Sequence, residues 1–138
     1  MHFRPYLNFD GTCAEAMAFY QSVFGGKLDV MRFKDVPEMP CPPEAGERVM
    51  HAHLDANGHS LMASDTMPGQ PYNGMTGFGV ALAFDTVAEA KRVFEALAAG
   101  GQVGMPMEAT FWVEIFGMVT DRFGTPWLIN GGKMMMSN

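Results

Sequence analysis

The sequence predicts an α+β fold built from two copies of one module, each running strand–helix–strand–strand–strand. The first observation is an internal repeat. Leu7-Asn8-Phe9-Asp10, followed by Ala14-Glu15-Ala16, returns as Leu82-Ala83-Phe84-Asp85, followed by Ala88-Glu89-Ala90. The second is that each copy ends its helical stretch with a glycine pair. A repeat this long, present only twice, does not fit a solenoid array. It predicts two similar half-domains packed together, with any site expected between them.

The first module is predicted to begin with a strand over residues 4–9, which alternate and are rich in aromatic side chains. Thr12 and Glu15 have the spacing of a capping box, so a helix is expected over 14–24, ended by Gly25-Gly26. Its apolar residues recur at steps of three and four. The next expected elements are a strand over 28–33, an acidic proline-rich loop over 35–47, and strands over 49–55 and 60–63 joined by a hairpin turn at Asn57-Gly58.

The second module repeats this order after a linker rich in glycine and proline. A strand is expected over 80–84, followed by a helix over 88–99 that Asp85 or Thr86 opens and Gly100-Gly101 ends. Short strands are expected over 102–107, 110–113, 118–120 and 126–129. The last residues carry no periodic or capping signal and are expected to fray.

Composition limits the classes of function. The 138 residues fit a single domain, 1–138, with module one over about 3–65, a linker over about 66–78, module two over about 79–131 and a frayed tail over 132–138. A net charge of −6 argues against nucleic acid and an anionic membrane surface as partners. Two cysteines without metal-type spacing and no long apolar run predict a reduced, soluble, cytoplasmic protein.

Several stretches resemble a known family. They are Pro5-Tyr6-Leu7-Asn8-Phe9, Leu61-Met62-Ala63-Ser64-Asp65 and the run from Phe116-Gly117-Met118 to Thr125-Pro126-Trp127. These stretches resemble the vicinal-oxygen-chelate superfamily of glyoxalase I, extradiol dioxygenases and the bleomycin and fosfomycin resistance proteins. Within it, they are similar to the PhnB-like branch, often labelled as a demethylubiquinone methyltransferase domain. The resemblance implies paired βαβββ modules whose curved mixed sheets enclose a cavity, and a homodimer.

The resemblance also implies where a divalent metal would be held, on the first and last strands of each module. The corresponding positions are Pro5, Met62, Gly79 and Leu128. None is a hard-metal ligand, and a shift of one residue, to Tyr6 or Val80, does not supply one. No cofactor is therefore expected and no metal ligand is assigned at these positions. If the protein is an enzyme, lyase, isomerase or dioxygenase chemistry is favoured over a true methyltransferase, because the chain lacks the strand–helix alternation of a doubly wound fold.

His51 and His53 are candidates for chemistry because they alternate with apolar residues and so project to one face of a strand. We expect His51 to act as an acid or base and His53 to contact a ligand, unless the pair is only a solvated feature of the strand. A displaced metal would need a third ligand, such as Glu114 or Asp65. Glu114 stands in an apolar run, where desolvation would raise its pKa and suit it to acid–base catalysis, unless it faces solvent. His51 aligns with Gly117 in the second copy.

The remaining candidates are expected to contact an apolar ligand or to be part of the core. Trp112, Phe116, Trp127 and Met62 are of the type that lines such cavities, and Asp65 is either a site residue or a turn former. Cys13, at a helix start, is expected to be a small structural residue there, and a thiol pKa lowered by the helix dipole is the alternative.

Three functions stay open at this point. The first is binding of a small apolar or aromatic molecule without the usual metal. The second is an enzyme that uses His51 with Glu114 or Asp65, or a relocated metal. The third is a dimeric interaction module.

Overall fold

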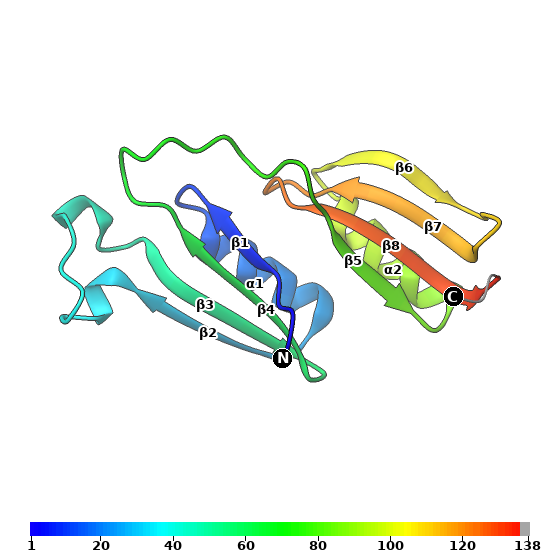
Figure 1. The fold of residues 1–138 in the computed structure, drawn as a ribbon, viewed down its shortest axis with the longest axis horizontal. Helices are drawn as coiled ribbons and strands as arrows, with labels where there is room; N and C mark the ends of the chain where they lie inside the picture. The colour runs from blue at the N-terminus through cyan, green and yellow to red at the C-terminus, as the bar shows by residue number, and fades with distance from the viewer. Residues whose placement is uncertain (136–138) are drawn as a thin grey trace. The chain divides into compact units, whose positions relative to one another are not determined.

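The computed structural model describes residues 1–135 and divides the chain into two compact units, Met1–Gly74 and Met75–Asn138 (Figure 1). The division falls inside the predicted linker. Each unit holds one helix and one four-stranded mixed sheet, which confirms the predicted α+β fold of two βαβββ modules. The cavity enclosed by the sheets stays a prediction. None of the helices in residues 1–135 is long and apolar enough to cross a membrane.

The sheet of the first unit has the strand order β1-β4-β3-β2. Strand β1 is parallel to β4, and the other neighbours are antiparallel. The elements are β1 (Tyr6–Phe9), α1 (Cys13–Phe24), β2 (Lys27–Arg32), the short 3-10 turns Phe33–Asp35 and Pro43–Ala45, β3 (Val49–Ala56) and β4 (His59–Asp65).

Alternation along the strands decides which face of this sheet is covered. Leu7, Phe9, Leu54 and Ala63 are buried and face α1, which contributes Met17 and other apolar residues to the same core. The residues between them point to the opposite face, which we call the helix-free face of the first sheet. It carries Tyr6, Asn8, His51, His53, Met62 and Ser64.

The second unit repeats this plan, with the strand order β5-β8-β7-β6 and α2 on one face. Its buried residues include Val93 and Leu97 of the helix and Val119 and Ile129 of the sheet. The helix-free face of the second sheet carries Phe116, Met118, Leu128 and Asn130. The elements are β5 (Val80–Phe84), α2 (Val87–Ala98), β6 (Gln102–Glu108), β7 (Val113–Thr120) and β8 (Pro126–Met134).

Two predictions for the second unit were wrong. Residues 110–113 and 118–120 are not separate strands, because β7 runs unbroken from Val113 to Thr120 and Thr110 forms a tight turn before it. The last strand also does not end at residue 129, since β8 continues to Met134 through a register shift opposite β7. Gly132, with φ at 84°, lies in this shift, where a side chain would collide with Glu114. The rest of the predicted frayed tail, residues 136–138, lies outside the described residues.

Strand register defines how the two copies correspond. Tyr6 lies beside Met62, and Ala81 lies beside Leu128, so Met62 and Leu128 are equivalent as predicted. Val80, not Gly79, then corresponds to Pro5. The same register makes Phe116, not Gly117, the counterpart of His51. The alignment by sequence was therefore one residue off in two strands, which decides the face to which each residue belongs.

Candidate functional site

The helix-free face of the first sheet brings together the two predicted histidines and a tyrosine. His53 lies directly opposite Met62, and Met62 lies beside Tyr6 on the edge strand. His51 is one step along β3 on the same face. The predicted pair therefore does share one face, with an apolar thioether between the histidine strand and the tyrosine.

His51 is held by Tyr6. The hydroxyl oxygen of Tyr6 lies 3.1 Å from Nδ1 of His51, and the two ring centroids are 5.7 Å apart. Either group can donate this hydrogen bond, depending on the tautomer of His51. The contact leaves Nε2 of His51 as the nitrogen that can meet a ligand. Tyr6 was missed as a site residue from the sequence, because its contact with His51 spans 45 positions.

His53 is engaged differently. Its Nε2 lies 3.0 Å from the hydroxyl oxygen of Ser60 on β4, and Asp29 of β2 lies opposite it. Each imidazole thus has one ring nitrogen within hydrogen-bond distance of a hydroxyl group. Such a partner fixes the orientation of the ring. This face combines the hydrogen-bonding groups of Tyr6 and the two histidines with the apolar side chain of Met62.

The helix-free face of the second sheet is more apolar. Met118 lies opposite Leu128 on one side and opposite Met105 on the other. Next along β7, Phe116 contacts Trp112, with ring centroids 5.4 Å apart and an interplanar angle of 61°. The predicted ligand residues Trp112 and Phe116 are therefore together and outside the core.

Glu114 is exposed on β7, so the desolvation expected from its apolar neighbours in sequence does not occur. Those neighbours alternate and point into the core, whereas the Glu114 side chain lies over Gly132. Its Oε1 accepts the backbone N–H of Lys133 at 2.7 Å. Glu114 belongs to the second unit and His51 to the first.

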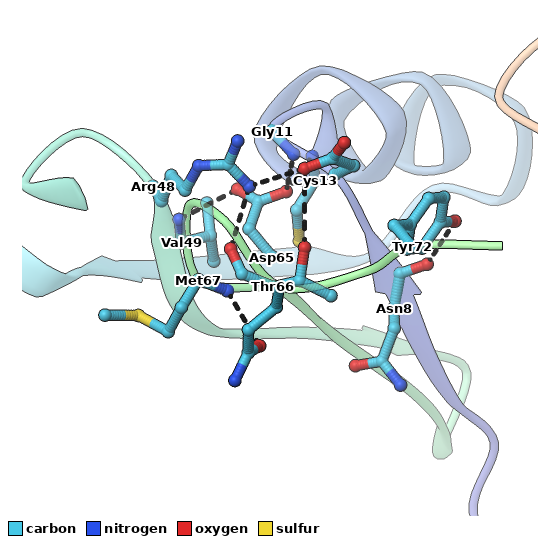
Figure 2. Close-up of polar contacts among 11 residues, drawn as sticks. Asn8, Gly11, Cys13, Arg48, Val49, Asp65, Thr66, Met67 and Tyr72 are labelled. Atoms are coloured by element: carbon cyan, nitrogen blue, oxygen red, sulfur yellow. Dashed lines mark hydrogen bonds and ion pairs between the residues drawn. The ribbon is translucent and has the colours of Figure 1, made fainter. Parts of the chain in front are cut away.

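Asp65 is buried, and its carboxylate is used within the fold (Figure 2). Oδ1 accepts the backbone N–H groups of Gly11 and Cys13 at 2.8 and 3.0 Å, and Oδ2 accepts that of Val49 at 2.9 Å. Asp65 thereby caps α1 from the neighbouring strand and replaces Thr12, whose side chain makes no capping bond. It points to the helix side of the sheet, so the predicted pairing of His51 with Asp65 is wrong.

A polar cluster surrounds this cap (Figure 2). The Nη1 of Arg48 donates to Asp10 Oδ1 at 2.9 Å and to the carbonyl oxygen of Thr66 at 2.8 Å. The hydroxyl of Tyr72 donates to the carbonyl oxygen of Asn8 at 2.7 Å. Burial, followed by the negative charges of Asp10 and Asp65, raises the pKa of Tyr72. The cluster attaches the start of the linker to the first unit.

The pKa of the Cys13 thiol is shifted in the direction opposite to a helix-dipole effect. Burial, and then the negative charge of Asp65, raise the pKa of its thiol from 9.0 to about 12, although Arg32 acts in the other direction. The carboxylate that caps α1 brings a negative charge to the place where the dipole is positive. Cys13 is therefore a neutral core residue.

Trp127 is a core residue of the second unit, only 1 % exposed. Its indole N–H donates to Oδ2 of the buried Asp121 at 2.8 Å. Because the hydrogen-bonding group of the ring is used internally, the placement differs from the predicted ligand contact.

The four positions that the superfamily resemblance assigns to a metal do not fit one. Met62 and Leu128 lie on the helix-free faces, but neither offers an oxygen or nitrogen ligand. Pro5 has no side-chain donor, and a side chain at Gly79 would collide with Leu128. Within residues 1–135, no three His, Cys, Asp or Glu side chains gather in a way that could hold a metal ion.

Comparisons with known proteins agree on the family. Residues 3–129 match the model of the Glyoxalase/Bleomycin resistance protein/Dioxygenase superfamily. YjdN of Escherichia coli is 37% identical, over 94% of this chain and 95% of its own. Protein PA1353 of Pseudomonas aeruginosa is 45% identical over 96% of this chain and 98% of its own, with a TM-score of 0.88.

A PhnB protein from Bacillus cereus is 25% identical, over 96% of this chain and all of its own, with a TM-score of 0.77. The predicted PhnB-like resemblance is thus confirmed. The chain belongs to the glyoxalase/bleomycin resistance protein/dioxygenase superfamily.

Proposed function

We propose that this protein binds a small apolar or aromatic molecule without the divalent metal that superfamily enzymes use. The observation that supports this most directly is the identity of the residues at the equivalent ligand positions. Met62 and Leu128 stand there, one on the helix-free face of each sheet. Apolar side chains at these positions favour contact with carbon surfaces over coordination of an ion.

The surroundings of these two residues suit such a ligand. Met62 is flanked by the Tyr6–His51 pair, which can donate to or accept from a single polar group on an otherwise apolar molecule. Leu128 is flanked by Met118, and thioether side chains adapt their shape to ligands. A few polar groups among apolar ones is the composition usual for small-molecule sites.

The proposal is tested by titrating a panel of aromatic compounds into chelator-treated protein by calorimetry. We expect binding to persist after chelation. Met62→Ala or Leu128→Ala should weaken it on the order of fivefold, since each loses about 1 kcal/mol of apolar contact. Met39→Ala, an exposed residue of the loop before β3, serves as the matched control. Binding that disappears with the chelator and returns with a divalent ion would overturn the proposal.

A second candidate function is acid–base catalysis by His51. The 3.1 Å contact with Tyr6 favours it, because a neighbour that orients an imidazole is a common feature of catalytic histidines. Once a ligand is found, mass spectrometry of the bound compound tests for turnover. Catalysis requires that His51→Ala abolish product formation while binding persists; unchanged product formation would end this candidate.

Homodimer formation and a cytoplasmic location stay predictions. Light scattering of the purified protein distinguishes a dimer of this chain from a monomer, and a monomer that still binds its ligand would remove the interaction module from consideration.

A further inference from the structure

Three aromatic rings stand together at one end of the second sheet, and we call them the aromatic row: Phe111, Trp112 and Phe116. The rings of Phe111 and Trp112 are 5.1 Å apart at an interplanar angle of 81°, so they form a corner. Trp112 and Phe116 meet at 61°. Phe111 is 75 % exposed, which leaves ring surface of this corner available to a ligand.

The loop that carries Phe111 and Trp112 is fixed by hydrogen bonds. Oγ1 of Thr110 accepts the backbone N–H of Val113 at 3.1 Å, and the N–H of Thr110 donates to the carbonyl oxygen of Val113 at 3.2 Å. From the other side, the backbone N–H of Met135 donates to the carbonyl oxygen of Trp112 at 2.7 Å. The rings are therefore presented by a preorganised backbone, which lowers the entropy lost on binding.

Carboxylates stand on both sides of Phe116. Glu114 lies two residues before it on the same face of β7, and Glu108 lies directly opposite it on β6. Both residues are exposed. Oε1 of Glu114 accepts the backbone N–H of Lys133, and within residues 1–135 neither carboxylate forms an ion pair.

We propose that the aromatic row with Glu108 and Glu114 binds the alkylated ammonium group of an organic cation. Ring faces attract a cation through their quadrupole, and rings set at steep angles can contact several sides of a trimethylammonium group. Two carboxylates whose charge no cationic side chain within residues 1–135 offsets add a long-range attraction for positive charge. This inference rests on the proposed function and narrows it, because it gives the apolar ligand a positive charge.

The test compares choline with 3,3-dimethylbutan-1-ol, which has the same shape without the charge. Binding is followed by fluorescence of Trp112 and by calorimetry, and the buried Trp127 is left intact in every variant. We expect choline to bind about tenfold more tightly than the neutral alcohol. Trp112→Leu should abolish choline binding, and E108Q with E114Q should reduce the preference to about twofold or less.

The matched control is Glu95→Gln on α2, which removes the same charge from an exposed helix position and should leave the preference unchanged. Thermal unfolding of each variant verifies that it is folded. Equal or tighter binding of the neutral alcohol would overturn this inference and leave the proposed function standing. If neither probe nor any aromatic compound of the calorimetric panel binds, both are overturned.

Discussion

The two helices begin in different ways although they occupy the same place in equivalent modules. In the first unit, Asp65 on β4 caps α1 across the sheet, through a residue 52 positions from Cys13. In the second unit, Thr86 caps α2 locally, since its Oγ1 accepts the N–H of Glu89 at 3.2 Å. The strand register makes Gly131 the counterpart of Asp65. A side chain at Gly131 would collide with Ala90 and with the carbonyl oxygen of Thr86.

The two units therefore share one backbone plan but fill the same space differently. Next to the last strand of the module, the start of the helix meets the Asp65 carboxylate in the first unit. In the second unit, the backbone at the start of α2 packs directly against Gly131. The helix-free faces differ in the same manner, with hydrogen-bonding groups around His51 and apolar groups around Met118. Equivalent scaffolds therefore do not imply equivalent chemistry.

Removing the Asp65 carboxylate is expected to have the largest effect on stability. Asp65→Ala leaves three backbone N–H groups without their acceptor, so we expect it to lower the free energy of unfolding by about 4 kcal/mol. Urea denaturation measures this loss. The control Asp29→Ala, at an exposed site on β2, should change stability by less than about 0.5 kcal/mol. A loss below about 1 kcal/mol for Asp65→Ala would contradict a cap that acts across the sheet.

Alkaline pH should destabilise the protein through Cys13. Its folded pKa of about 12 lies above the unfolded value of 9.0, so between these pH values the unfolded chain binds fewer protons than the folded one. The contribution of Cys13 to the free energy of unfolding is therefore fully present below pH 9. It falls as the pH rises above 9, by at most about 1.4 kcal/mol per pH unit. Denaturation at pH 8 and pH 10.5 should show the fall in the wild type and a smaller one in Cys13→Ala. Equal falls in both would assign the effect to other groups.

The local cap of α2 should matter less than the cap of α1. Thr86→Ala removes one exposed capping bond, and we expect a loss of about 1 kcal/mol in the free energy of unfolding. Thr86→Ser keeps the hydroxyl and should restore most of it. Equal losses in the free energy of unfolding for Thr86→Ala and Asp65→Ala would contradict the conclusion that the cap of α1 stabilises the fold more than the local cap of α2.

The sequence allowed the fold to be predicted because its signals are local. Apolar steps of three and four, the Asn57-Gly58 turn and the paired glycines each act within one element, and their repetition identified the modules. The strand over 110–113 was predicted wrongly because a short apolar run such as Phe111-Trp112-Val113 occurs both in turns and in strands. The end of β8 was predicted too early because Gly131-Gly132 indicated the end of the strand, whereas the strand continues through them by a register shift.

The site was harder to predict because its contacts are long-range. Tyr6 meets His51 across 45 positions, and Asp65 meets Gly11 across 54. No local pattern tells whether a carboxylate such as Asp65 will meet a ligand or a helix start. His51 and His53 could be placed on one face, since strand alternation is local, but their partners could not.

Metal-independent binding on the helix-free faces is tested most directly by methionine-methyl NMR of chelator-treated protein. Signals are assigned with Met62→Leu and Met118→Leu, and the fully buried Met17 provides an internal reference. Addition of an aromatic ligand should shift the methyl signal of Met62 or Met118 and leave that of Met17 unchanged. Signals of Met62 and Met118 that stay still until a divalent ion is added would contradict the proposed function.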